Sequence, residues 1–394
     1  MTATAEPRAD AGAPGPLRVL YTNHVTEISG AENSLLALLT HLDRERFSPI
    51  LALPEASGPL AERAQALGVP VHGVPFLRLH KTGNPLTNLR QVAGLWKARR
   101  AIGKLCRAED VRVVHANSFH SALACAMKGP RIAPVIWHVR DVLMPREVVR
   151  WLAGRVHRMI AVSGAVAKYM VAIAPEHAGK VVLVHNGIDT EALTLTRPPG
   201  ELRAELGVPD DAPLVACVGQ LVPWKRQDIL IEAAQSVARV YPQAHFAIVG
   251  ADMFGEHADY VGKLKKLAAD GAANVRFLGY RPDALDIIAA ADVLAHPATA
   301  EPLGRVVLEA MAVGTPVVAA NAGGPAELLE DAESGLLVEP ADPKALSEGL
   351  LWLLENPGYG AELAEKARER VVANFSAQGM ARKTEAVYRE VLRQ

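Results

Sequence analysis

Residues 300–318, AEPLGRVVLEAMAVGTPVV, place two glutamates, Glu301 and Glu309, around the start of a predicted helix. Pro302 disfavours a helical conformation at Glu301 and suits the first position of a helix. We therefore expect Glu301 in the preceding turn and Glu309 about two turns into the helix. A buried strand, TPVVAAN (315–321), follows directly. Alternating helices and apolar strands are typical of an α/β domain.

The same alternation extends in both directions along the chain. Further strands are expected at LRVLYT (17–22), FSPILAL (47–53), VRVVHAN (111–117), APVIWHV (133–139) and RMIAVS (158–163), and a second series begins with PLVACVGQL at 213. Their apolar runs are continuous, which is typical of parallel strands covered on both faces. A Pro-rich polar stretch at 194–213 is predicted to be a linker. We therefore predict two doubly wound domains that face a cleft.

Composition narrows the class of protein. The 394 residues are 50% hydrophobic and include three cysteines without metal-ligand spacing, which favours a reducing, cytoplasmic setting. Residues 1–16 lack the apolar segment of a signal peptide, and we expect them to be a disordered tail. The net charge of −1 conceals +9 over residues 1–190 and −10 over residues 191–394. A basic half of this kind suits an anionic surface or acceptor, although drift in composition would also produce it.

Two other functions of such a fold fit the sequence poorly. The segment after the first strand, NHVTEISGAE (23–32), lacks the G-x-G-x-x-G of a dinucleotide-binding dehydrogenase, and no Walker A motif is present. If residues 301–309 were all helical, Glu301 and Glu309 would lie ~12 Å apart, because the rise is about 1.5 Å per residue. That separation exceeds the roughly 6.5–9.5 Å of an inverting glycosidase.

The helix start is better suited to an anion. Free amides around Leu303, Gly304, Arg305 and Val306 could receive a phosphate, and Gly304 lets it approach closely. Because a phosphate repels carboxylates, Glu301 and Glu309 should contact neutral hydroxyls instead. A diphosphate between two hydroxyl-bearing groups describes a nucleotide sugar. The pattern alone also fits a capped surface helix.

A resemblance decides between these interpretations. The stretch EPLGRVVLEAMAVGTPVVAANAGGPAEL (301–328) resembles the donor-binding signature of the retaining glycosyltransferases of family 4, or group 1, which have the GT-B fold. Further landmarks match in order at AVSGAV (161–166), NGID (186–189), VGQLVPWK (218–225) and VRFLG (275–279). The resemblance implies an N-terminal domain over 17–190, a nucleotide-sugar-binding domain over 191–375, and a final helix, 376–394, that packs back on the first domain.

The resemblance also implies roles for individual residues. Glu301 should bind hydroxyls of the transferred sugar, Glu309 those of the ribose, and Lys225 the diphosphate. His138 should lie beside the donor sugar, so the catalytic candidates are His138, Lys225 and Glu301. Arg140 and Asp141 would shape acceptor binding. The other donor-binding candidates are Gly30, Asn186, Gln220, Arg226, Tyr280, Leu303, Gly304, Arg305 and Val306. The family often has Arg where this chain has Gln220, and Arg226 or Arg305 is the alternative source of that charge.

The expected reaction moves a sugar from a UDP- or GDP-sugar to an acceptor hydroxyl with retention of configuration. No Asp-x-Asp pair or metal-ligand cluster is evident, so we expect neither metal nor cofactor. No nucleophile is evident, and the family's favoured route is same-face attack. The acceptor could be a lipid-linked or cell-surface glycan or a small metabolite. The alternatives are a non-catalytic sugar-binding protein, or a phosphorylase or epimerase on the same fold.

One basic segment suggests a further contact. Residues 89–107 carry Arg90, Lys97, Arg99, Arg100, Lys104 and Arg107 on a predicted amphipathic helix. Its apolar face would consist of Leu89, Val92, Leu95, Trp96, Ile102 and Leu105. The helix is either an ordinary surface helix or a weak peripheral contact with anionic lipid at the inner face of the membrane.

Overall fold

The computed structural model describes residues 15–77, 84–142 and 144–393, apart from the side chains of Pro85 and Asn88. The expected disordered tail, 1–16, lies outside this range except for Gly15 and Pro16. Among the described residues, no helix combines the length and apolar character needed to cross a membrane.

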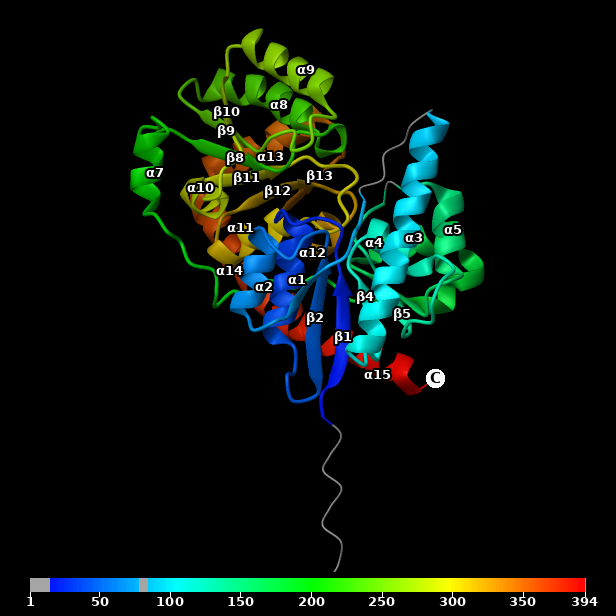
Figure 1. Cartoon of the computed structure of the whole chain (residues 1–394). Helices are drawn as coiled ribbons and strands as arrows, with labels where there is room; N and C mark the ends of the chain where they lie inside the picture. Colours follow the sequence, from blue (N-terminus) through cyan, green and yellow to red (C-terminus); the bar gives the residue numbers. More distant parts are fainter. Residues whose placement is uncertain (1–14, 78–83, 143, 394) are drawn as a thin grey trace, which may run out of the picture.

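A seven-stranded parallel sheet forms the N-terminal domain (Figure 1). Its strand order is β3-β2-β1-β4-β5-β6-β7. The strands are β1 (Leu17–Thr22), β2 (Phe47–Leu53), β3 (Val71–Gly73), β4 (Val113–Ala116), β5 (Val135–Val139), β6 (Arg158–Ala161) and β7 (Val181–Leu183). The helices are α1 (Gly30–His41), α2 (Pro59–Ala66), α3 (Pro85–Ala108), α4 (Phe119–Ala126), α5 (Arg146–Ala153) and α6 (Gly164–Ile173), with a 3-10 turn, η1, at Pro175–Lys180.

A second parallel sheet, with six strands in the order β10-β9-β8-β11-β12-β13, forms the C-terminal domain. The strands are β8 (Leu214–Val218), β9 (His245–Val249), β10 (Asn274–Gly279), β11 (Val293–His296), β12 (Val317–Ala320) and β13 (Leu336–Val338). The helices are α7 (Pro199–Glu205), α8 (Gln227–Val240), α9 (Ala258–Ala269), α10 (Ala284–Ala290), α11 (Arg305–Val313), α12 (Pro325–Leu328), α13 (Pro343–Glu355) and α14 (Pro357–Asn374), with a 3-10 turn, η2, at Pro223–Lys225. The predicted fold class of two doubly wound domains is confirmed.

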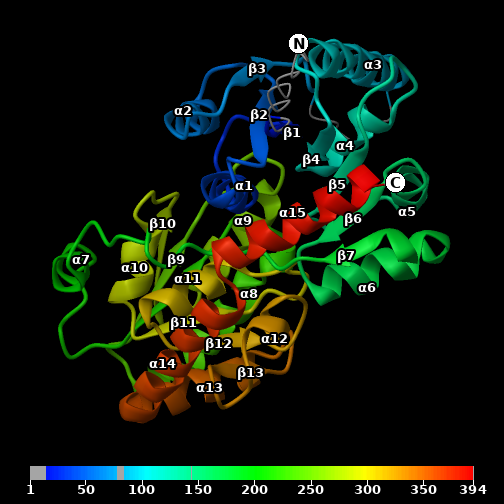
Figure 2. The same cartoon turned by 90° about the horizontal axis from the view of Figure 1, so that it is seen from below.

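The last helix, α15 (Ala377–Arg393), leaves the C-terminal domain and packs on the N-terminal one. Its residues Met380, Tyr388 and Val391 are buried in the same apolar cluster as Leu35 of α1 and Ile160 of β6. Figure 2 shows this crossing from below. The helix therefore makes the C-terminus of the chain part of the first domain's core.

Two segments cross between the domains side by side. The amide of Ile188 donates to the carbonyl of Phe375 at 2.8 Å, and the amide of Ala377 donates to the carbonyl of Ile188 at 3.0 Å. A side chain on Gly187 would collide with the backbone of Ser376, so only glycine allows this approach.

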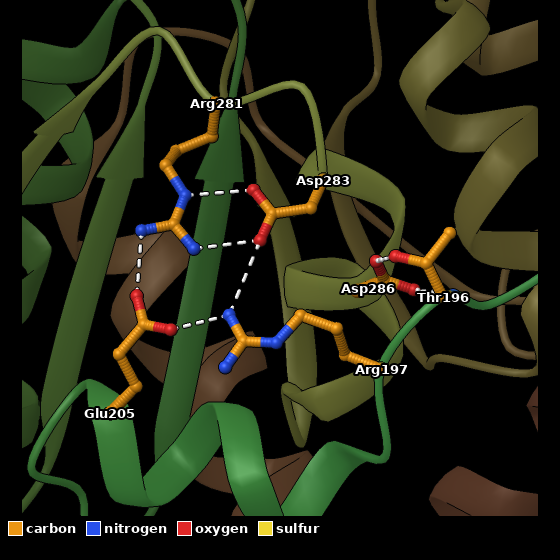
Figure 3. Close-up of polar contacts among 6 residues, drawn as sticks. All are labelled: Thr196, Arg197, Glu205, Arg281, Asp283 and Asp286. Atoms are coloured by element: carbon orange, nitrogen blue, oxygen red, sulfur yellow. Dashed lines mark hydrogen bonds and ion pairs between the residues drawn. The ribbon is translucent and has the colours of Figure 1, made fainter.

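The predicted linker over 194–213 contains a short helix, α7. The linker is also fixed to the C-terminal domain (Figure 3). The buried carboxylate of Asp286 accepts hydrogen bonds from the amide of Thr196 at 2.8 Å and from its hydroxyl at 2.6 Å. Arg197 pairs with Glu205 and Asp283, and Arg281 pairs with the same two carboxylates. Any hinge in this linker must therefore precede Thr196.

The two domains also touch directly. The carboxylate of Glu327, on α12, accepts hydrogen bonds from the amides of Gly164 and Ala165 at 2.7 and 2.5 Å, at the N-terminus of α6. Its Oε2 lies 3.1 Å from His185 Nε2. This contact satisfies free helix amides with a negative charge, as helix geometry favours. It joins the carboxyl ends of the two sheets.

The basic helix α3 differs from the expected amphipathic pattern. Arg99 is buried and donates from Nε to the carbonyl of Met127 at 3.1 Å, so it is not part of the cationic surface. Ile102 is fully buried, whereas Leu89, Val92 and Trp96 are exposed. The predicted single apolar face is therefore wrong, because the C-terminal half of α3 packs on its domain while the apolar residues of the N-terminal half face outward.

Candidate active site

Most of the predicted donor-site residues follow the carboxyl ends of parallel strands. Gln220 follows β8, Tyr280 follows β10 and Glu301 follows β11 in the C-terminal sheet. In the N-terminal sheet, His138 lies at the end of β5 and Asn186 follows β7. This edge of an open α/β sheet is where such folds bind ligands.

Glu301 and Lys225 form a mostly buried ion pair at the centre of the site. Lys225 ends η2 after β8, and its ammonium contacts Glu301 Oε2. His296, the last residue of β11, places Nε2 3.6 Å from the same oxygen. Burial raises the pKa of Glu301, but the charge of Lys225 and the nearby imidazole outweigh it and hold this pKa well below its usual value. The carboxylate is therefore ionised and can accept hydrogen bonds from sugar hydroxyls.

The helix after Glu301 begins later than predicted. Gly304 is the N-cap of α11, with φ of +94°, and Arg305 is the first helical residue. Pro302 is therefore in the turn and not at the first helical position, and Glu309 lies just over one turn into the helix. The positive φ of Gly304 keeps the preceding turn out of the helix, and Gly323 and Gly324 lie directly against the backbone of Glu301 and Leu303. The amide of Gly324 donates to the carbonyl of Glu301 at 2.9 Å.

Several amides at the start of α11 lack a backbone acceptor among the described residues. Within the described chain, Val307 is the first residue of α11 whose amide has a backbone acceptor, the carbonyl of Gly304 at 2.9 Å. The amides of Leu303, Gly304, Arg305 and Val306 precede it and are not used in backbone hydrogen bonds. At Gly304 a Cβ would lie 3.1 Å from Pro325 Cγ and would be strained by the positive φ.

Glu309 is held by a neighbour on its own helix. Arg305 Nε donates to Glu309 Oε1 at 2.9 Å. Burial raises the pKa of Glu309, and Arg305 opposes this rise. Glu309 lies about one helical turn beyond the free amides at the start of α11.

The remaining C-terminal candidates have different environments. Arg226 adopts a left-handed conformation, and its guanidinium pairs with Asp228 at 3.0 Å. Arg226 and Arg305 are both paired with carboxylates, as Lys225 is, so either would have to leave its partner to supply the charge that Gln220 lacks. Tyr280 is 61% exposed, so its ring is available to a ligand.

In the N-terminal domain, the candidates join one buried polar network. Arg140 Nη1 donates to Asn186 Oδ1 at 2.9 Å, and Arg140 Nε donates to Asn117 Oδ1 at 3.0 Å. Arg140 is buried, which lowers its pKa to about 10. Arg140 Nη2 lies 3.3 Å from Nδ1 of the fully buried His138. Asp141, in contrast, is exposed.

This network extends to the first helix. Asn117 Nδ2 donates to Asn23 Oδ1 at 3.1 Å, and Asn23 Nδ2 donates to Glu32 Oε1 at 3.1 Å. Glu32 also accepts a hydrogen bond from the amide of Ser29 at 3.1 Å. Glu32 is therefore buried and structural, and more than a first-turn charge near the helix dipole. Its position fixes the start of α1 at Gly30, where an added Cβ would lie 3.8 Å from Arg305 Cδ across the domain interface.

Sequence reasoning gave no role to three of these groups: His296, Asn23 and Glu327. Each is a polar side chain at or just after a strand end or on a short helix, which is only a weak signal on its own. Their partners come from residues distant in the chain, such as Glu301 for His296 and Gly164 for Glu327.

Comparison with known families agrees with this geometry. A model of the glycosyl transferases group 1 matches residues 200–370, and a model of glycosyltransferase family 4 matches residues 28–192. The chain belongs to these glycosyltransferases. The two matches divide between the two sheets, and the group 1 match contains the Lys225–Glu301 pair.

Individual relatives match over part of their length. A GDP-mannose-dependent monoacylated alpha-(1-6)-phosphatidylinositol monomannoside mannosyltransferase of Corynebacterium glutamicum is 38% identical over 203 residues, which cover 48% of this chain and 51% of that protein. A D-inositol 3-phosphate glycosyltransferase of Nocardioides sp. is 33% identical over 246 residues, which cover 59% of this chain and 53% of that protein. The chain thus spans about half the length of the curated relatives it matches.

Solved structures match over nearly the whole chain. The structure of Anabaena HepE in complex with UDP-glucose superposes with a TM-score of 0.77 at 27% identity, covering 94% of this chain and 99% of HepE. A sucrose-phosphate synthase from Thermosynechococcus elongatus shares the fold, with a TM-score of 0.74 at 20% identity. The superposition covers 96% of this chain and 99% of that protein. The predicted GT-B fold is confirmed.

We expect Glu309→Gln to raise the donor KM by one to two decades. The substitution keeps the shape of the side chain but weakens hydrogen bonds to a charged group, which contribute about 1.5–3 kcal/mol each. Because burial raises the pKa of Glu309, donor affinity should increase as pH rises through that pKa in the wild type only. Calorimetric titration with donor across pH measures both effects. The exposed Glu348→Gln is the control, and unchanged affinity in Glu309→Gln would remove the ribose role.

Proposed function

We propose that this protein transfers a sugar from a nucleotide diphosphate sugar to an acceptor hydroxyl, with retention of anomeric configuration. The observation that carries the proposal is the pairing of Lys225 with Glu301 beside the free amides of α11. The site thus offers a cation and helix amides for a diphosphate, and a carboxylate for a sugar. The names of the mannosyltransferase relative and of the HepE complex support GDP- and UDP-sugars as the donors to test.

Donor binding would rearrange the central ion pair. A diphosphate at the N-terminus of α11 would attract the Lys225 ammonium, which neutralises charge as the nucleoside diphosphate leaves. Glu301 would then be free to accept hydrogen bonds from the sugar, close to His296. In the same-face route, the departing phosphate accepts the acceptor's proton. Lys225 and the α11 amides would stabilise that phosphate, and His138 would contact the sugar.

The chemistry of this site does not depend on a metal ion in our proposal. Lys225 and the α11 amides supply the positive charge that a divalent ion gives other transferases. Within the described residues, no group of three or more His, Cys, Asp or Glu side chains is arranged to hold a metal.

The test is a panel of UDP- and GDP-sugars offered with simple sugar and inositol acceptors, with release of nucleoside diphosphate as the readout. We expect acceptor-dependent release with at least one donor, undiminished by EDTA, and a product with the donor's anomeric configuration by NMR. Donor binding without release would favour a non-catalytic sugar-binding protein. Activity without an acceptor would favour an epimerase or a hydrolase, and dependence on inorganic phosphate a phosphorylase.

We propose that the acceptor is reached at an anionic lipid surface through α3. Leu86, Leu89, Val92 and Trp96 form an exposed apolar row on its N-terminal half, with Leu86 and Leu89 at 68% and 67% exposure. Exposed cations lie along the same helix at Arg90, Lys97, Arg100, Lys104 and Arg107. Apolar side chains and cations on one interfacial helix suit anionic headgroups.

Co-sedimentation with vesicles tests this contact. Because each cation near such a surface contributes about 1 kcal/mol, we expect weak binding to anionic vesicles that high salt abolishes. Arg100→Glu combined with Lys104→Glu should remove the binding, and Leu89→Ser should weaken it. The matched control reverses two exposed cations of α9, Lys265→Glu and Lys266→Glu. No wild-type binding to anionic vesicles at low salt would favour a soluble acceptor.

A further inference from the structure

A line of four buried aromatic side chains connects the C-terminal helix to His138. Tyr388 of α15 donates a hydrogen bond to the hydroxyl of Tyr21 at 2.9 Å. Its oxygen also lies 2.7 Å from His115 Nδ1, and His115 Nε2 lies 3.0 Å from His138 Nδ1. All four side chains are fully shielded from solvent. The opposite nitrogen of His138, Nε2, is buried without a hydrogen-bond partner among the described residues.

Both histidines are neutral in this environment. Burial lowers the pKa of His115 to about 3, and burial together with the charge of Arg140 lowers the pKa of His138 well below its usual value. A neutral imidazole has one N–H and one bare nitrogen. The proton positions along the line are therefore linked, because each nitrogen that faces a neighbour must be either a donor or an acceptor.

The direction of these hydrogen bonds follows from the tyrosines. The single hydroxyl hydrogen of Tyr388 is used on Tyr21, so its oxygen accepts from Nδ1–H of His115. His115 Nε2 is then bare and accepts from Nδ1–H of His138. The remaining nitrogen of His138, Nε2, is consequently bare and can accept a hydrogen bond from a hydroxyl.

One contact favours the opposite arrangement. Arg140 Nη2 lies 3.3 Å from His138 Nδ1, and a guanidinium can only donate, so this contact alone would leave Nδ1 bare. Reversing every hydrogen bond of the line would keep the same distances, so the distances do not decide between the two arrangements. The reversed line needs Tyr21 to donate to Tyr388, whereas in the structure Tyr388 donates to Tyr21 at 2.9 Å, and this contact decides for a protonated Nδ1 on His138.

We propose that Tyr388 and His115 are positioning residues that fix the tautomer of His138, so that its Nε2 accepts a hydrogen bond from a hydroxyl of the transferred sugar. This inference rests on the proposed function. In this proposal α15 does more than pack on the N-terminal domain. Its Tyr388 hydrogen-bonds to His115, and His115 in turn hydrogen-bonds to His138. A bound hydroxyl would also satisfy this buried nitrogen, which has no hydrogen-bond partner in the part of the chain that the structure describes.

Nitrogen NMR of ¹⁵N-histidine-labelled protein tests the tautomer without any activity, because the protonated and bare nitrogens of a neutral imidazole resonate far apart. The His138 signals are identified by their loss in His138→Gln. We expect Nδ1 protonated and Nε2 bare in the wild type. A wild-type spectrum with the proton on Nε2 would overturn the assignment, even if the tyrosine variants fail to fold.

Two tyrosine variants test the connection. Tyr388→Phe removes the acceptor for His115, so the Arg140 contact should prevail and move the His138 proton to Nε2. Tyr21→Phe releases the Tyr388 hydrogen to turn toward His115 Nδ1, which should have the same result without contacting His138. For both, we expect kcat/KM with the intact sugar donor to fall about tenfold to a hundredfold while the affinity for nucleoside diphosphate alone changes less than about twofold, because the lost hydrogen bond is to the sugar.

The control is Val391→Ala, a core substitution on the same helix, which should lower Tm but leave kcat/KM and the His138 spectrum unchanged. Wild-type kcat/KM and an unchanged spectrum in Tyr388→Phe would overturn the positioning role. If the wild type shows no transfer with any donor, the proposed function fails, while the wild-type spectrum and the two tyrosine spectra still decide whether the tautomer is fixed as described.

Discussion

Replacing Lys225 with alanine should lower kcat/KM by about 10²–10³. The substitution removes the ammonium that would neutralise the leaving diphosphate, and removal of one preorganised group of this kind has such an effect. It also leaves Glu301 mostly buried without its main partner. The free energy of unfolding should therefore fall by roughly 1–3 kcal/mol, less than for a fully buried pair. Steady-state kinetics and denaturant unfolding measure the two effects.

Two further variants separate the effects on catalysis and stability. The combined variant Lys225→Met, Glu301→Gln removes both charges, so stability should recover toward the wild type while activity stays low. The exposed Lys344→Ala is the control and should change neither quantity. If kcat/KM of Lys225→Ala stayed within about threefold of the wild type, Lys225 would not act on the diphosphate.

Glu301→Gln is the second substitution with a large expected effect. The neutral amide keeps the shape but loses charged hydrogen bonds to the sugar, and it leaves the Lys225 charge unpaired. We expect kcat to fall at least about a hundredfold, with nucleoside diphosphate alone binding as well as before. Calorimetry with nucleoside diphosphate and with the intact sugar donor distinguishes these two contributions.

Glu301→Gln should also change how the free energy of unfolding depends on acid pH. Because the folded pKa of Glu301 is below its unfolded value of about 4.5, its ionised form stabilises the protein above that pH. This contribution is lost as pH falls through the folded pKa. Glu301→Gln should therefore unfold with a weaker dependence on acid pH than the wild type. Equal acid dependence of both proteins would show that the Lys225–Glu301 pair does not form in solution.

Much of the fold could be predicted because its signals are local. The apolar runs at β1, β2, β5 and β8 are continuous, which predicts buried parallel strands. In a parallel sheet the carboxyl ends of the strands lie at the same edge, so the residues that follow them are predicted to lie near one another. Glu301, Lys225 and Glu309 were predicted in this way, with the family signature, and the structure brings Glu301 and Lys225 into contact.

The rest depended on contacts between distant residues. α11 starts at Arg305 and not at Pro302, after a turn that lies against the backbone of Gly323 and Gly324, about twenty residues further along the chain. Arg99 seemed exposed by helical periodicity, but Met127, on another element, supplies its acceptor. The line from Tyr388 to His138 likewise requires coordinates.

The most direct test of the proposed function is release of nucleoside diphosphate from a set of UDP- and GDP-sugars, measured side by side for the wild type, Lys225→Ala and Glu301→Gln. The account predicts that the wild type releases nucleoside diphosphate from at least one donor in the presence of an acceptor, and that both variants lose at least 99% of this rate while remaining folded. Binding of no donor by the wild type, or equal release by all three proteins, would contradict it.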